Sequence, residues 1–176
     1  MTSESLSIRL TLRQLRHPGD LFIFLCRIKD KQTLELSITL RSWGDREKSR
    51  MVFGFYGRDT RPPSPYFGTS SRLLVLQATG GATKAFAGPG DKDAMFDWTP
   101  TGAGTLVTYR GIYSFASHAW TLEARWKGGS TTFFSDRPVE FSPSDIGALA
   151  ITLEHQMPTE GRAGHSKITD ISLKIY

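Results

Sequence analysis

Two segments of the chain alternate strictly between apolar and polar residues. The first begins at Leu6 and ends at Arg13, and the second begins at Leu34 and ends at Arg41. Because successive side chains of a strand point to opposite faces, this period of two predicts strands with one buried and one solvated face. Such strands are typical of antiparallel sheets. If the two segments pair, Arg9, Arg13 and Arg41 share the solvated face.

Other stretches of the chain have the character of short strands separated by turn-forming residues. Strand candidates lie at 21–28, 50–56, 73–77, 95–98, 105–109, 119–126, 131–134, 139–141, 149–153 and 168–175. The sequence Lys-Gly-Gly-Ser at 127–130 lies between two of them and predicts a tight hairpin. The helix signal is a single turn at 142–145, which Ser142 can cap. This pattern predicts an all-β fold, either an antiparallel two-layer β-sandwich of the jelly-roll or lectin-like kind or a closely related β-barrel.

Length and composition favour a single β domain over residues 1–176. The chain is 39% hydrophobic and 22% charged, which is typical of a globular protein and unlike a disordered or membrane protein. Its longest apolar run, residues 21–26, is far shorter than the roughly 20 residues that a membrane-spanning helix needs. We therefore expect no transmembrane segment. We also expect no classical signal peptide, so that the protein is cytoplasmic or released without one.

The positive charge of the chain is concentrated in its first third. Residues 1–61 hold 12 Lys/Arg and 7 Asp/Glu, which accounts for the whole net charge of +5. Such asymmetry attracts anionic partners, and Arg9, Arg13 and Arg41 are the residues expected to meet one. A solvated strand face explains the same pattern. The nearest approach to a nucleic-acid-binding segment, residues 41–50, contains its own acidic residues, so nucleic acid is not an expected partner.

Motifs for the common catalytic and cofactor chemistries are missing from the sequence. Residues 80–84 contain glycines and a lysine but lack the spacing of a phosphate-binding loop. The GxSxG elbow of serine hydrolases does not occur. No histidine pair has the spacing of a metal site; the histidines are His17, His118, His155 and His165. We therefore expect no metal and no cofactor.

Aromatic residues are densest over residues 109–126, where they have two interpretations. Aromatic rings have an apolar body that can stack on a ligand. From His118 to Trp126, however, alternate residues fall on one strand face, which is typical of a core. Tyr113 and His118 lie where this alternation breaks, so they are freer to form a site.

The two long connections at 57–72 and 78–104 are the other expected location of a site, because sites on β scaffolds often lie in loops. They contain Arg58 and Trp98. Together with the aromatic segment, they complete the set of candidate ligand-binding residues, which is Arg58, Trp98, Tyr109, Tyr113, His118 and Trp120.

The spacing of the aromatic residues over 113–126 is similar to the lipid- or sugar-binding region of the anemone cytolysin and fungal fruit-body lectin superfamily. The similarity is confined to this segment and includes no complete motif of that superfamily. It implies no functional residues for this chain.

Three classes of function remain open from the sequence. The leading hypothesis is a non-catalytic β-sandwich binding module for a glycan or another polar, and in one version anionic, ligand. The alternative is a small enzyme that performs acid–base chemistry on a small molecule or polysaccharide in an aromatic-lined cavity. The third is a capsid-like or assembly protein, which would form homo-oligomers. An aromatic groove, a cavity with paired acid and base groups, and a flat apolar patch would distinguish the three.

Overall fold

The chain folds into two antiparallel sheets. The computed structural model describes residues 6–10, 21–23, 28–43, 49–57, 72–79, 83–87, 94–96, 105–155 and 165–176. Sheet A contains, in spatial order, β1 (Leu6–Leu10), β12 (His165–Ile175), β3 (Thr33–Trp43), β8 (Leu106–Ser114), β9 (Ala119–Trp126) and β10 (Gly129–Pro138). Sheet B contains β2 (Leu21–Ile23), β11 (Ile146–His155), β4 (Ser49–Gly57), β5 (Arg72–Thr79), β6 (Thr83–Ala87) and β7 (Ala94–Phe96).

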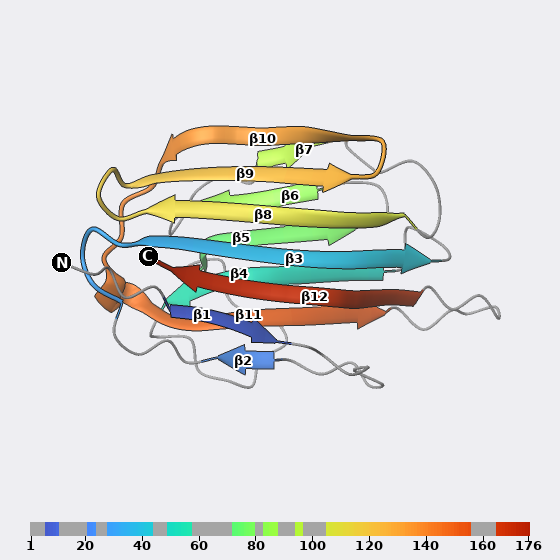
Figure 1. Ribbon diagram of the computed structural model, residues 1–176, viewed down its shortest axis with the longest axis horizontal. Helices are drawn as coiled ribbons and strands as arrows, with labels where there is room; N and C mark the ends of the chain where they lie inside the picture. Colours follow the sequence, from blue (N-terminus) through green and yellow to red (C-terminus); the bar gives the residue numbers. More distant parts are fainter. Residues whose placement is uncertain are drawn as a thin grey trace.

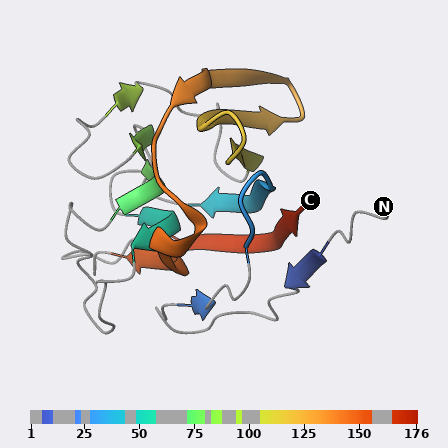
Figure 2. The ribbon, with the colours of Figure 1, turned by 90° about the vertical axis from the view of Figure 1, so that its left-hand side faces the viewer.

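The sheets lie face to face as two layers, with sheet A in front of sheet B in Figure 1 and beside it in the end view of Figure 2. The antiparallel two-layer sandwich predicted from the alternation is therefore confirmed. The long connection expected at 78–104 contains β6, which the sequence pattern did not predict, and β7, which overlaps the strand candidate at 95–98. Within the described residues, no helix has the length and apolar character to cross a membrane.

The core fills the space between the inner faces of the two sheets. In β3, the alternation predicted from the sequence places Leu34, Leu36, Ile38 and Leu40 on the buried face. Sheet B contributes residues such as Phe53 to the same cluster. Burial of this apolar surface is the main favourable term in folding, at about 25 cal/mol per Å².

The predicted hairpin and helical turn both form. Trp126 and Gly129 pair across the turn between β9 and β10, as the glycines at 128 and 129 predict. A single 3-10 turn, η3 (Pro143–Asp145), follows Ser142, whose backbone N–H donates to the Asp145 carboxylate at 2.6 Å. Both elements are local, so the sequence pattern is sufficient to predict them.

The two alternating segments lie in one sheet but do not pair with each other, because β12 lies between β1 and β3. Arg9 pairs with Ser172 of β12, and Arg41 pairs with Leu106 of β8. Arg13 lies outside the described residues. A common solvated face for the three arginines remains a prediction.

Candidate functional site

Three of the predicted ligand-binding aromatics lie in the core. Tyr109 is 3% exposed, Tyr113 is 1% exposed and Trp120 is 4% exposed. They project from β8 and β9 toward sheet B, and Tyr113 and Trp120 face each other across the two strands. A ring stacks on a ligand only through an open face. The expectation that these rings form a surface site is therefore corrected: they pack the interior.

Tyr113 is held by other aromatic rings and by the backbone. Its ring stacks on Phe141 with the centroids 4.4 Å apart, and the Phe115 ring meets it edge-on at 4.9 Å. Its hydroxyl donates a hydrogen bond to the Val139 carbonyl at 2.8 Å. Burial raises the pKa of Tyr113 to about 12. These contacts make Tyr113 a structural residue that joins β8 to the segment after β10.

His118 is the exposed member of the predicted set among the residues that the structure describes. It lies in the turn between β8 and β9, where its φ of 49° is in the left-handed region. Its carbonyl accepts a hydrogen bond from the Val139 N–H at 2.9 Å. Its Nδ1 lies 3.4 Å from the Tyr113 hydroxyl oxygen, at the limit of a hydrogen bond.

A small cavity of about 20 Å³ lies between the sheets. It is lined by Leu34, Leu36, Phe53, Gly54, Phe55, Leu74, Leu76, Gly111, Tyr113, Trp120 and Leu122. A space of this size accommodates about one water molecule, not a sugar ring. Its lining contains no carboxylate, histidine or lysine. This cavity is therefore not the acid–base site that the enzyme hypothesis requires.

Arg58 and Trp98 lie outside the described residues, but the strands beside them are described. Arg58 follows Gly57, the last residue of β4, and Trp98 comes two residues after Phe96, the last residue of β7. Pairing through β6 and β5 aligns Phe96 with Met51 of β4. Gly57 lies six residues beyond Met51, which is about 20 Å along a strand. The strand ends beside Arg58 and Trp98 are therefore at opposite ends of sheet B.

Several connections between strands start and finish at strand ends on one side of the sandwich. This is the end where β3 finishes at Trp43, on the right in Figure 1, and we call it the Trp43 end. In sheet A, Trp43 pairs with His165, and in sheet B, His155 pairs with Ser49. The described strand ends on either side of 44–48, 80–82, 97–104 and 156–164 lie there, as does the turn between Trp126 and Gly129. Trp98 belongs to the connection 97–104.

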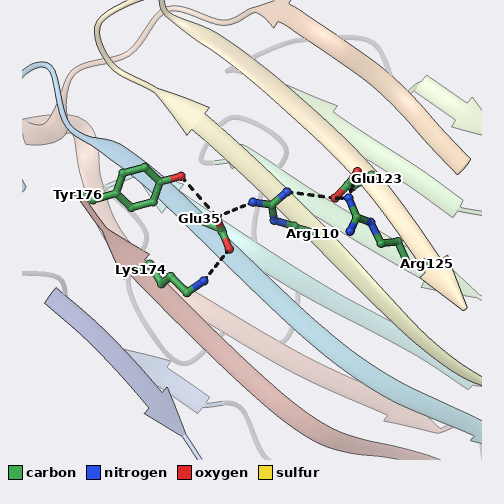
Figure 3. A network of polar contacts seen from close by, with 6 residues as sticks. All are labelled: Glu35, Arg110, Glu123, Arg125, Lys174 and Tyr176. Atoms are coloured by element: carbon green, nitrogen blue, oxygen red, sulfur yellow. Dashed lines mark hydrogen bonds and ion pairs between the residues drawn. The ribbon is translucent and has the colours of Figure 1, made fainter. Parts of the chain in front are cut away.

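A network of charged side chains crosses the outer face of sheet A, the face turned away from sheet B. Figure 3 shows it together with Tyr176, whose hydroxyl donates to Glu35 at 3.4 Å. The Glu35 carboxylate accepts from Arg110 Nη2 at 2.7 Å and from Lys174 Nζ at 3.1 Å. Arg110 also reaches Glu123 of β9, at 3.2 Å. The network therefore links four neighbouring strands, β12, β3, β8 and β9.

Arg110 and Lys174 favour the ionised form of the Glu35 carboxylate. The hydrogen bond from Arg110 lowers the pKa of Glu35 below its ordinary value of 4.5, and Lys174 lowers it further. The same hydrogen bond raises the pKa of Arg110. A general acid needs a carboxyl group whose pKa is raised toward neutrality. Glu35 has the opposite shift, so it is unsuited to act as the general acid of a glycosidase.

Sequence reasoning did not single out this network. Glu35 was visible only as a polar position in an alternating strand, and Arg110 and Glu123 were not weighed together. The signal lies in the register, which places Arg110 opposite Glu123 across β8 and β9. Pairing between distant strands is not encoded in local alternation. In the described part of the chain, no group of three or more His, Cys, Asp or Glu side chains is arranged to hold a metal ion.

Comparison with known proteins gives a fold but no family. No family model matches the chain, and no curated protein matches its sequence. Solved structures match it over almost its whole length. The carbohydrate recognition domain of Emp47p superposes with a TM-score of 0.63 at 14% identity, covering 98% of this chain and 88% of that domain. The chain has the fold of the legume-type lectins.

Plant lectins superpose on the chain with similar completeness. Peanut lectin gives a TM-score of 0.55 at 11% identity and covers 99% of this chain and 98% of its own. Lectin II from Ulex europaeus gives a TM-score of 0.57 at 9% identity, and the match covers 98% of this chain and 97% of the lectin. At such low identity, these matches define the arrangement of strands and carry no residue-level equivalence. None of these three proteins is described as a cytolysin or a fungal fruit-body lectin.

Proposed function

We propose that this chain is a non-catalytic glycan-binding module of the lectin type. The observation that carries the proposal is the match of the whole sandwich, over nearly the full length of both chains, to proteins described as lectins or carbohydrate recognition domains. One of these structures, the lectin UEA-II, is described as a complex with galactose. The lowered pKa of Glu35 makes that carboxyl group a poor general acid.

We place the glycan site at the Trp43 end of the sandwich. Described strand ends there flank several connections, including 97–104, and loops carried by a rigid sheet scaffold are where binding sites concentrate. The connection 97–104 supplies Trp98, an aromatic residue suited to stacking on a sugar. Arg58 follows a strand end at the opposite end of sheet B, so a single compact site at the Trp43 end excludes it.

The test is a glycan array probed with the full chain, followed by titration calorimetry with the best neutral glycan. Trp98→Ala should weaken that binding by about 5- to 30-fold, because loss of an aromatic stacking contact costs roughly 1–2 kcal/mol. Arg58→Ala is the matched control and should change the affinity by less than about twofold, the size of a distant surface change. If Arg58→Ala weakens binding and Trp98→Ala does not, the site lies instead at the opposite end of the sandwich, where β4 ends at Gly57. Absence of binding to any glycan would refute the proposed function.

The anionic partner expected at Arg9, Arg13 and Arg41 also remains a proposal. Arg9 and Arg41 belong to β1 and β3 of sheet A, within the segment 1–61 that accounts for the net charge of +5. Retention of the chain on an immobilised sulfated polymer, with elution by salt, is the corresponding measurement. The side chains that the structure does describe on this sheet lead to a more specific inference.

A further inference from the structure

In the charged network on the outer face of sheet A, the carboxylate side chains are less exposed to solvent than the cationic side chains. The side chains of its two carboxylates are nearly buried, with Glu35 9% exposed and Glu123 16% exposed. Its cations stand further out, with Arg110 at 32%, Lys174 at 49% and Arg125 at 61%. Although the network is close to charge-balanced, a partner approaching this face therefore meets mainly N–H donors.

The buried carboxylates hold these cations in place. Glu123 accepts hydrogen bonds from Arg125 Nη2 at 3.1 Å and from Arg110 Nη1 at 3.2 Å, while Glu35 accepts one from Lys174 at 3.1 Å. An arginine has five N–H donors and a lysine has three, so each cation has more donors than these contacts use. Because these side chains are already held in place in the free protein, they lose less conformational entropy when a ligand binds.

The cations are arranged in a line across the sheet. Lys174 is on β12, Arg110 on β8 and Arg125 on β9, and the order of strands is β12, β3, β8, β9. The register places Lys174, Arg110 and Arg125 level with Glu35, Ser37 and Thr39 of β3, so the line is diagonal. Three strand spacings of about 4.8 Å and four residues along the strands give a span of about 20 Å between the first and last backbone positions. This spacing fits a ligand that repeats its negative charges along an extended chain.

Short hydroxyl-bearing side chains lie between and beside the cations. Ser37 of β3 pairs with Ser172 on one side and with Arg110 on the other. In the next row, the hydroxyl groups of Thr39 and Thr108 hydrogen-bond to each other at 2.8 Å. Side chains this short do not cover the cationic groups, and their hydroxyl groups can both donate to and accept from sugar hydroxyls.

We propose that the outer face of sheet A binds an extended anionic polysaccharide, whose carboxylate or sulfate groups contact Lys174, Arg110 and Arg125. This surface is separate from the glycan site proposed at the Trp43 end. Among the described side chains of this face, Tyr176 is the aromatic one, and its hydroxyl contacts Glu35. Sequence-independent binding of single-stranded nucleic acid relies on rows of aromatic rings that stack on bases. The face therefore fits a polysaccharide better than a nucleic acid.

The experiment measures binding of the full chain to dextran sulfate, with uncharged dextran and single-stranded DNA as comparison probes. The test variant is the double substitution Lys174→Gln and Arg125→Gln, which leaves Arg110 to hold both carboxylates. The matched control is Lys29→Gln with Lys31→Gln, which removes the same charge from an exposed turn before β3. Melting temperatures of both variants establish that each is folded.

We expect the test variant to bind dextran sulfate about tenfold more weakly than the wild type, through loss of two ionic contacts, and the control to lose less than about twofold. Uncharged dextran should not compete. Equal weakening in both variants, no binding of dextran sulfate, or DNA binding as tight as that of dextran sulfate would each overturn the proposal. The wild type, the test variant and the control should bind a neutral glycan equally well. If none of the three binds a neutral glycan, that result counts against the site at the Trp43 end and not against the anionic surface.

Discussion

Truncation of Tyr113 separates a core role from a binding role most sharply. The ring stacks on Phe141, meets Phe115 edge-on and is 1% exposed, and its hydroxyl donates to the Val139 carbonyl. Tyr113→Ala removes all of these contacts, whereas Tyr113→Phe removes the hydrogen bond alone. The exposed His118, five residues away in the adjacent turn, is the control.

The magnitudes follow from these contacts. Truncating a buried large aromatic costs about 3–5 kcal/mol, so we expect about 4 kcal/mol for Tyr113→Ala. Tyr113→Phe leaves the Val139 carbonyl without this donor and should cost about 1–2 kcal/mol. His118→Ala should cost less than about 0.5 kcal/mol, because the side chain is exposed. Whole domains are stable by only about 5–15 kcal/mol, so the first value is a large part of the total.

Urea unfolding of the wild type and the three variants, followed by tryptophan fluorescence, gives these free energies. In thermal melts, 1 kcal/mol corresponds to about 2–4 °C for a chain of this size. A loss below about 1 kcal/mol for Tyr113→Ala, with a larger loss for His118→Ala, would contradict the core assignment. It would return Tyr113 to the list of candidate binding residues.

Two further predictions concern the backbone and the charged network. Gly54→Ala should lower the free energy of unfolding by about 3 kcal/mol or more, because a Cβ there would collide with the Leu74 carbonyl oxygen and the φ of +152° is unfavourable for residues with a side chain. Gly128→Ala, in an exposed turn, is the control and should be nearly neutral in the same urea titration. Because the folded-state pKa of Glu35 is lowered, its ionised form stabilises the fold at neutral pH and this contribution disappears as the pH falls below 4.5. Glu35→Gln should therefore be less stable at pH 7 and lose less stability in acid, and parallel pH profiles for wild type and variant would refute the assigned role.

Alternation was sufficient to predict the sandwich, and it failed where the chain departs from a regular pleat. The sequence pattern predicted a strand that ends at Tyr109, because Gly111 occupies an inward position where a large apolar residue would be expected. In the structure, β8 continues to Ser114. A Cβ at Gly111 would lie 3.1 Å from Nε1 of Trp120, so the indole occupies the space that the glycine leaves. The apparent break at Tyr113 was therefore a packing adjustment between two strands, which no local pattern reveals.

The edge strand β10 departs from alternation for a related reason. Register shifts flank Phe134, and both it and Phe133 pack against the core although they are consecutive. Phe133 stacks on Tyr109 and Phe134 meets Trp120 edge-on. Bulges of this kind are common on edge strands, where they also prevent pairing with another chain.

The candidate site was less predictable than the fold. Burial of Tyr109 and Trp120 depends on which strands flank them, and a sequence of alternating residues does not specify its neighbours. The charged network likewise requires Glu35 and Arg110, which are 75 residues apart in sequence, to lie on adjacent strands. Trp98 and Arg58 remain predictions from loop position alone.

The central claim is that this sandwich binds a glycan without transforming it. Its most direct test is calorimetric titration of the full chain with the best glycan from an array, with recovery and analysis of that glycan after prolonged incubation. We predict saturable binding with one site and a chemically unchanged glycan. Binding followed by cleavage of the glycan, or no saturable binding to any member of the array, would contradict the account.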